Sequence, residues 1–290
     1  MGKMLVIADL KDSCIATPRG LQLAQKLGHA VEVVAFTYAP LSRMNKSNAE
    51  QKAIKSQLLE KRRRDVQARI DKYRAPDQTV SLKVVWEKDI HHWVIKRSVR
   101  SIDMVVKTGS HKDSIIHTST DWQLLRECRT PVLIVAEKKW HKTRPVLAAI
   151  DLGATSAQKK QLNHLIISRS KVLAEALDAE LHLICAIEIP TLLADMDLVD
   201  PSGYVREARE KMAPAIAELA KAHDLPARSF RIKKGPVEKV ITSVAAKQRA
   251  QLLVMGTVGR RGVRARLLGN TAEKVLRHLR TDVLTLKLPA

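Results

Sequence analysis

An internal repeat constrains this fold more than any other feature, because the chain follows one succession of apolar runs and amphipathic stretches twice. Residues 125–133 (LRECRTPVL) match residues 276–284 (LRHLRTDVL), and each segment is typical of a helix end, a turn containing Thr and a last strand. Residues 4–9 (MLVIAD) and 146–151 (VLAAID) match in the same way, as apolar strands that end on an acid. The sequence therefore predicts two copies of one domain.

The boundary between the copies is placed in the charged connector at residues 137–144 (EKKWHKTR), which gives domains at 1–140 and 141–290. The apolar fraction of 45% is sufficient for two packed cores. Aromatic residues make up only 3%, so aliphatic side chains must fill those cores.

Short apolar runs alternate with helical patterns throughout both copies. This order predicts an α/β fold of two tandem Rossmann-like domains, each a five-stranded parallel sheet with helices on both faces. The long helix at 49–74 is predicted to pack through Ile54, Leu58, Val66, Ile70 and Tyr73, with Arg62, Arg63 and Arg64 on its wet side. In the second copy, a loop is expected at 189–204 before the next helix.

A glycine-bearing basic loop follows a late apolar strand of the second copy. Residues 252–254 predict that strand, residues 272–280 predict a helix, and the loop between them has the spacing G-x2-G-x9-G. Glycines let a backbone approach a phosphate, and the N-terminus of a helix presents free N–H groups and positive potential. The loop also carries arginines that suit phosphate oxygens, namely Arg260, Arg261, Arg264 and Arg266. The segment from Met255 to Thr271 is therefore predicted to bind an anion.

This loop differs from the commonest nucleotide signatures. No G-x-x-x-x-G-K-[ST] motif occurs, and a dinucleotide fingerprint would follow the first strand of its unit. The spacing instead resembles the nucleotide-binding motif of the universal stress protein family, whose last glycine is normally followed by Ser or Thr. Asn270 and then Thr271 follow it here.

The resemblance covers essentially the whole chain and is to tandem members of the E type. It is carried in the first copy by Lys107-Thr108 and by residues 120–125 (TDWQLL). It implies the adenine nucleotide alpha hydrolase-like fold, pairing of the two domains through their last strands, and a link to survival under stress. It also implies ATP or another adenine nucleotide as the ligand, with Mg²⁺ as an allowed companion, and a regulatory or binding role in place of efficient catalysis.

The family's functional positions map onto the second copy. Asp151 resembles the residue that contacts adenine or ribose, Ala186 falls where a small apolar residue faces the base, and the remaining positions face phosphate and ribose. For Asp151 the alternative is a structural acid that caps the next turn, and for the glycines it is turn chemistry alone. The predicted nucleotide-binding residues are Asp151, Ala186, Gly256, Gly259, Gly269, Asn270 and Thr271.

The first copy departs from this motif. Asp9 is retained, but the segment 107–120 contains only Gly109, and Thr118 and Ser119 stand where Gly269 and Asn270 stand in the second copy. We expect no nucleotide site of the family type there.

The net charge of +21 leaves a second functional class open. Such a surface attracts nucleic acid or anionic lipid, so the alternative is a nucleotide-independent binding module; a solvated basic surface is the plainer interpretation. Slow ATP hydrolysis or autophosphorylation also stays open, although no nucleophile elbow or HExxH motif is present and the protein is expected not to be an enzyme.

The remaining features indicate an intracellular chain. Cys14, Cys128 and Cys185 are widely spaced and odd in number, which favours reduced thiols and a cytoplasmic location. No apolar run reaches membrane-spanning length. His91 and His92 are interpreted as helix surface and not as metal ligands. Both a monomer and a homodimer are compatible with tandem domains.

Overall fold

The computed structural model describes residues 2–9, 15–99, 101–109, 119–136, 140–141, 143–190, 200–257 and 268–288. The chain divides into two compact units: the described residues up to 136 form the first unit and those from 140 onward form the second. None of the helices in these ranges is long and apolar enough to cross a membrane.

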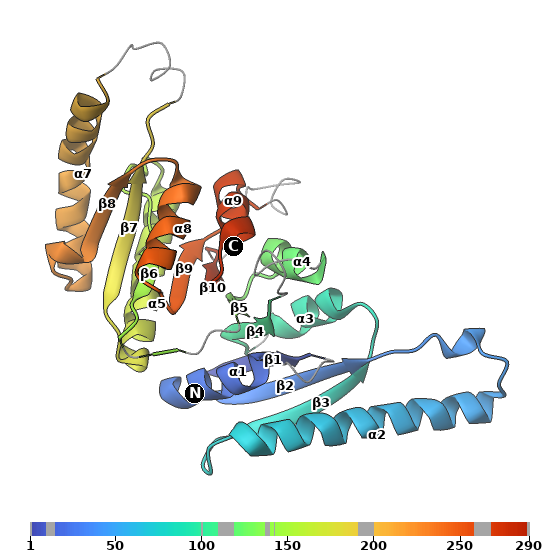
Figure 1. The fold of residues 1–290 in the computed structure, drawn as a ribbon. Helices are drawn as coiled ribbons and strands as arrows, with labels where there is room; N and C mark the ends of the chain where they lie inside the picture. The colour runs from blue at the N-terminus through green and yellow to red at the C-terminus, as the bar shows by residue number, and fades with distance from the viewer. Residues whose placement is uncertain are drawn as a thin grey trace. The chain divides into compact units, whose positions relative to one another are not determined.

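The first unit contains a parallel sheet with the strand order β3-β2-β1-β4-β5 (Figure 1). Helix α1 packs against α2, and α3 packs against α4, as expected when the strand order moves outward in both directions from β1. The elements are β1 (Lys3–Ala8), α1 (Ala16–Leu27), β2 (Ala30–Thr37), the 3-10 turn η1 (Leu41–Arg43), α2 (Asn48–Tyr73), β3 (Val80–Trp86), α3 (Ile90–Ser98), β4 (Met104–Thr108), α4 (Ser119–Glu127) and β5 (Val132–Val135).

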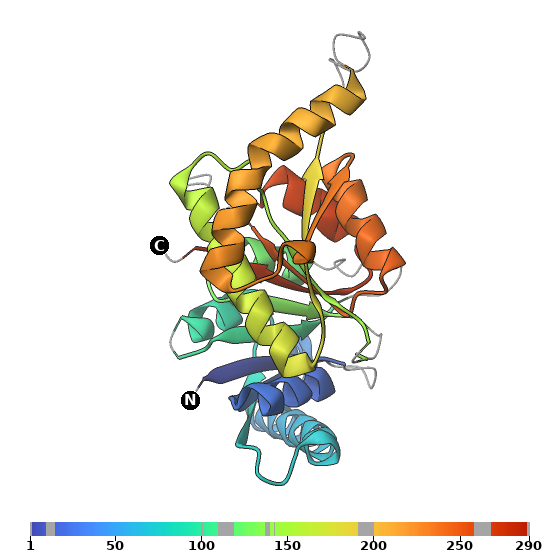
Figure 2. The same ribbon diagram turned by 90° about the vertical axis from the view of Figure 1, so that its left-hand side faces the viewer.

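The second unit repeats this plan with the order β8-β7-β6-β9-β10, again all parallel. Helices α5 and α7 lie side by side on one face of the sheet, and α8 packs against α9 (Figure 2). The α/β fold class predicted from the sequence is confirmed. The elements are β6 (Val146–Ala149), α5 (Ala157–Leu177), β7 (Leu181–Ile187), α7 (Pro201–His223), the 3-10 turn η2 (Ala227–Ser229), β8 (Phe230–Lys234), α8 (Val237–Lys247), β9 (Leu252–Gly256), α9 (Asn270–His278) and β10 (Asp282–Leu286).

Local capping explains where two of the long helices begin. The Ser47 hydroxyl accepts the Glu50 N–H while the Glu50 carboxylate accepts the Ser47 N–H, so α2 starts with a capping box. At α7 the Asp200 carboxylate accepts the N–H groups of Ser202 and Gly203, and Pro201 occupies the first helical position. The loop predicted at 189–204 is therefore wrong over its last four residues, which are helical.

Two side chains of α2 depart from the prediction. Tyr73, predicted to pack, is 47% exposed. Arg62, predicted to face water, is only 7% exposed, and its Nη2 donates to the carbonyls of Ala8 (2.8 Å) and Asp9 (2.7 Å). These carbonyls lie at the end of β1, so a charge-assisted hydrogen bond compensates for burial of the guanidinium.

Part of the connector belongs to the second unit. Trp140 Nε1 donates to Asp282 Oδ2 at 2.9 Å, and the His141 N–H donates to Gln251 Oε1 at 3.1 Å. Asp282 and Gln251 are buried at the starts of β10 and β9. The connector thus fixes the amino-terminal edge of this sheet.

Candidate functional site

The carboxyl ends of β6, β7 and β9 bring three predicted site residues to one edge of the sheet. Ala149 of β6 is in register with Ile184 of β7 and with Met255 of β9. Asp151 lies two residues beyond Ala149, Ala186 lies two beyond Ile184, and Gly256 follows Met255. Adjacent strands are about 4.8 Å apart, so these positions share one short stretch of the edge.

This edge is also where the order of strands reverses. From β6 the chain moves to β7 and β8 on one side, and it then returns to β9 and β10 on the other. In open α/β sheets, ligands bind at the carboxyl ends of the strands beside such a switch point. The topology alone therefore selects the neighbourhood of Asp151 as the candidate site.

The backbone of Asp151 is held by the side chain of Asn163 on α5. The Asp151 N–H donates to Asn163 Oδ1 at 3.0 Å, and Asn163 Nδ2 donates to the Asp151 carbonyl at 2.7 Å. The Asp151 carboxylate accepts the Gly153 N–H at 3.1 Å, which is the turn-capping contact that the sequence left open. Its second oxygen lies 3.1 Å from Lys159 Nζ, and both side chains are half exposed. The carboxylate is thus oriented and still accessible.

Cys185 lies beneath this turn. Burial raises the pKa of its thiol to about 11, the Leu152 N–H opposes this rise, and the negative charge of Asp151 adds to it. The thiol is therefore protonated at neutral pH and adds no charge to the site. Ala186, the next residue, is partly exposed at the same edge.

Gly256 has a packing reason for lacking a side chain. A Cβ atom there would lie 2.5 Å from Cδ2 of Leu162, 2.9 Å from its Cγ and 3.2 Å from Cδ1 of Ile166. Helix α5 therefore packs directly on the end of β9, and this contact by itself accounts for the glycine.

Gly269 differs from Gly256. It is the N-cap of α9, with a φ of −64° and a ψ of 140° that any residue adopts, and no side chain caps the helix there. A Cβ would meet no heavy atom of the described residues within 4 Å. Asn270 and Thr271 are exposed in the first turn. Among the described residues, no atom would therefore clash with a side chain at the N-cap of α9.

Gly259 and the four arginines of the loop lie outside the described residues. Six of the seven predicted positions can therefore be placed: Asp151, Ala186 and Gly256 on the sheet edge, and Gly269, Asn270 and Thr271 at the start of α9.

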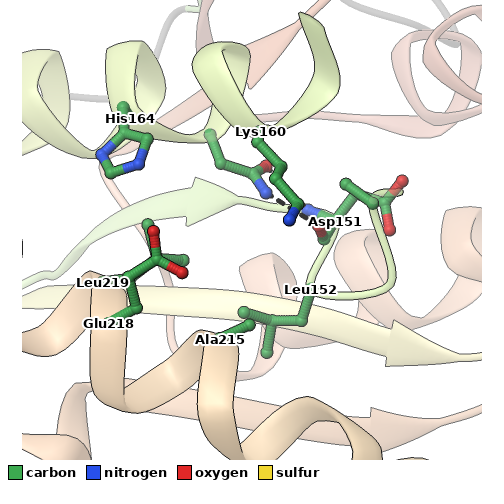
Figure 3. Close-up of a pocket in the computed structure, with 9 residues that line it drawn as sticks. Asp151, Leu152, Lys160, His164, Ala215, Glu218 and Leu219 are labelled. Carbon is green, nitrogen blue, oxygen red and sulfur yellow. Dashed lines mark hydrogen bonds between the residues drawn. The ribbon is translucent and has the colours of Figure 1, made fainter. Parts of the chain in front are cut away.

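A small pocket adjoins Asp151 on the face of the sheet that α5 and α7 cover. Its cavity volume is about 40 Å³. Lys160 and His164 approach it from α5, whereas Glu218 reaches in from α7; the Asp151 carboxylate is turned to the outside of its loop (Figure 3). Sequence reasoning did not find this pocket, since its wall depends on how α7 packs against α5. It shares only Asp151 with the predicted residues.

The corresponding edge of the first unit is occupied by its own side chains. The Gly109 N–H donates to the last residue of β5 just as the Thr257 N–H donates to the last residue of β10, so Thr108 is the counterpart of Gly256. The Thr108 hydroxyl oxygen accepts the N–H groups of Ile15 and Ala16 at the start of α1.

A buried ion pair joins β4 to α4 beside Thr108. Lys107 Nζ lies 2.6 Å from Oδ1 of Asp121, whose side chain is fully buried. A carboxylate of the protein itself thus neutralises the cation at this edge.

On α3, His91 Nδ1 lies 2.6 Å from an Asp89 oxygen, and the described residues contain no cluster of three or more groups that could hold a metal ion.

Comparison with known proteins agrees with this architecture. The sequence profile of the universal stress protein family matches residues 142–287. Universal stress protein E of Salmonella typhi is 30% identical over 98% of this chain and 93% of its own length. The universal stress protein E homolog of Haemophilus influenzae is 32% identical over 83% of this chain and 80% of its own.

Two solved structures show the same fold along the whole chain. A functionally unknown protein from Pseudomonas aeruginosa PAO1 aligns with a TM-score of 0.69 at 24% identity, covering 98% of this chain and 92% of its own. A universal stress protein from Archaeoglobus fulgidus aligns with a TM-score of 0.64 at 20% identity, covering 98% of each chain. On the profile match and the near full-length relatives, this chain belongs to the universal stress protein family and carries the family's fold twice.

Proposed function

We propose that this chain is a stress-response binding protein whose second unit holds ATP or a related adenine nucleotide, and that it acts through occupancy and not through catalysis. The observation that supports this most directly is the meeting of Asp151, Ala186 and Gly256 at the switch point of the second sheet. The first turn of α9, which follows β9 through the arginine-bearing loop, supplies N–H groups for a phosphate.

Each part of the edge suits one part of the nucleotide. A carboxylate accepts hydrogen bonds only, so Asp151 suits the hydroxyl and amino donors of adenosine. The first turn of α9 suits a phosphate, because Gly269 at its N-cap has no side chain to hinder approach to the helix backbone. The exposed Asn270 amide can donate to a phosphate oxygen. Mg²⁺ would accompany the phosphates of the nucleotide.

The first unit gives a physical contrast within the same chain. There the hydroxyl of Thr108, the counterpart of Gly256, accepts the N–H groups of Ile15 and Ala16 at the start of α1, and Asp121 supplies the negative charge beside Lys107. We therefore expect one nucleotide per chain. Calorimetric titration should give a stoichiometry near one, and a value near two would contradict the assignment of the site to the second unit alone.

A matched pair of substitutions tests the phosphate position. Asn270 and Asn48 are both exposed first residues of helices, α9 and α2. A new carboxylate at either position suits the helix dipole, so both variants should fold. Next to a bound phosphate, however, the negative charge in Asn270→Asp should weaken the binding free energy of the nucleotide by roughly 1–3 kcal/mol, which is about 5- to 150-fold in affinity.

The measurement is calorimetry with ATP on the wild type, Asn270→Asp and Asn48→Asp. We expect Asn270→Asp alone to lose affinity. Equal affinities in all three proteins would place the phosphates elsewhere, and no heat from the wild type at millimolar ATP would reject nucleotide binding.

A further inference from the structure

Aromatic residues are rare in this chain, yet several of them gather at one place in the first unit. Of nine Phe, Trp and Tyr residues, four lie at or beyond the carboxyl ends of β2 and β3 or on α3 beside them. Two lysines lie over their rings. This aromatic edge cluster comprises Phe36, Tyr38, Trp86 and Trp93 with Lys55 and Lys83.

The cluster consists of two ring pairs at the end of the β2–β3 ladder. Tyr38 and Trp86 have ring centroids 5.7 Å apart, and Lys55 Nζ of α2 lies 5.3 Å from the centre of the Trp86 ring. Phe36 and Trp93 meet edge to face at 5.4 Å, and Lys83 Nζ lies 5.4 Å from the Trp93 ring.

The exposed part of the cluster is Tyr38. It is 48% exposed, so its ring reaches solvent while Trp86 supports it from within the sheet edge. Phe36 is buried and anchors the second pair. The strand β3 is the outer strand of its unit and carries no fully buried residue. A flat, supported ring thus faces water at an open margin of the sheet.

The charges around Tyr38 favour an anion. Lys55 has Lys52 one turn before it on the same side of α2, and both are exposed. The carboxylates closest in sequence are already engaged: Glu87 accepts the N–H groups of Lys88 and Asp89, and Asp89 in turn pairs with His91. Lys55 and Lys52 thus place two exposed ammonium groups on the side of α2 that reaches Trp86, the ring that packs against Tyr38, while Glu87 is hydrogen-bonded to the backbone of the turn after β3.

We propose that the aromatic edge cluster binds single-stranded nucleic acid, with a base stacked on Tyr38 and the adjoining phosphates on Lys55 and Lys52. Stacking on supported aromatic rings beside a positively charged track is how proteins hold single strands without sequence preference. A duplex hides its base faces, so it offers this ring nothing to stack on. The cluster lies in the first unit and does not depend on the nucleotide site proposed for the second.

The test uses the full chain and a 5′-fluorescein-labelled oligouridylate of twelve residues, followed by fluorescence anisotropy at 50–200 mM salt. Removing the stacked ring with Tyr38→Ala should weaken binding by roughly 5- to 150-fold. Tyr38→Phe keeps the ring and should stay within about twofold of the wild type. With phosphates on Lys55 and Lys52, the slope of log affinity against log salt should be roughly −1.4.

Tyr73→Ala is the matched control, because Tyr73 is 47% exposed and has Lys72 Nζ over its ring at 5.3 Å, at the far end of α2. It should bind like the wild type. Likewise Lys55→Gln should weaken binding, whereas Lys61→Gln on the same helix should not. Circular dichroism checks that each variant is folded.

Four results would overturn the proposal. The first is equal binding by Tyr38→Ala and Tyr73→Ala, and the second is duplex RNA of equal length that binds as tightly as the single strand. The third is full displacement of the oligonucleotide by ATP. The fourth is Tyr38-dependent capture of phosphatidylglycerol vesicles in place of the oligonucleotide. The last would identify a membrane as the occupant. If ATP does not displace the oligonucleotide, this surface and the proposed nucleotide site are independent of each other.

Discussion

Replacement of Gly256 by Ala gives the sharpest test of how the second unit is built. The new Cβ would lie 2.5 Å from Cδ2 and 2.9 Å from Cγ of Leu162, well inside van der Waals contact. Leu162 is 7% exposed and the neighbouring Ile166 is 2% exposed, so neither side chain can move out into water. Either α5 shifts away from β9 or Leu162 adopts a poorer rotamer.

The expected loss of stability in Gly256→Ala follows from the effect of overpacking in a well-packed core. One extra methyl group that forces such adjustments destabilises by about 1–3 kcal/mol. Gly269→Ala is the control, because its Cβ meets no described atom within 4 Å and its backbone conformation suits any residue. Because Gly is preferred over Ala at an N-cap, that change should lower the free energy of unfolding by no more than about 1 kcal/mol.

The assay is urea unfolding followed by circular dichroism, with both glycine variants and a double-mutant cycle. Leu162→Ala alone should cost roughly 2–5 kcal/mol. In the double variant the new methyl group fills part of the space that Leu162 vacated, so the combined cost should be smaller than the sum of the two single costs.

Two outcomes would refute the packing explanation. One is a Gly256→Ala variant as stable as wild type, and the other is additive behaviour with Leu162→Ala. If Gly256→Ala kept full stability but lost nucleotide affinity, its glycine would serve the ligand and not the helix.

Three further predictions rest on titratable and charged groups. Asp121→Asn leaves the Lys107 ammonium buried without a counter-charge and should cost roughly 3–5 kcal/mol in urea unfolding; Lys107→Met in the same chain should recover part of this loss. Burial, and then the neighbouring imidazole of His164, lowers the pKa of His223. The unfolded chain therefore takes up that proton first, so stability should fall as the pH drops below about 6.5, and His223→Gln should flatten this dependence in unfolding curves measured from pH 5 to 8. Because the pKa of the Cys185 thiol is about 11, iodoacetamide at pH 8 should leave Cys185 unmodified in the native protein and alkylate it in urea; rapid native alkylation by mass spectrometry would contradict its burial.

The succession of strands and helices and the parallel sheets could be predicted from the sequence because each element depends on a local pattern. Each buried parallel strand is a short apolar run, and the alternation with helices leaves few topologies. The prediction of one loop over 189–204 was wrong at the start of α7, although Asp200 before Pro201 is a local signal for the beginning of a helix.

The contacts that shape the site could not be predicted in this way, because each joins segments far apart in the chain. Arg62 is buried by carbonyls of β1, more than 50 residues earlier. Gly256 needs its missing side chain because of Leu162 on α5, and Asp151 is oriented by Asn163. Residue type and spacing pointed to Gly256 and Asp151 but placed Arg62 on the wet side of its helix. The packing reason in each case emerged only from tertiary contacts.

The two edges of this duplicated fold respond differently to their surroundings. The first unit closes the corresponding edge with Thr108 and the Lys107–Asp121 pair, so we expect ATP to add nothing to its folding free energy. If the second unit holds a nucleotide, mass action adds about 2.7 kcal/mol at a hundred times the dissociation constant. Nucleotide would then raise the thermal midpoint of the second unit and leave that of the first unit unchanged. The difference between the two midpoints would therefore report the nucleotide concentration, with the first unit as an internal reference.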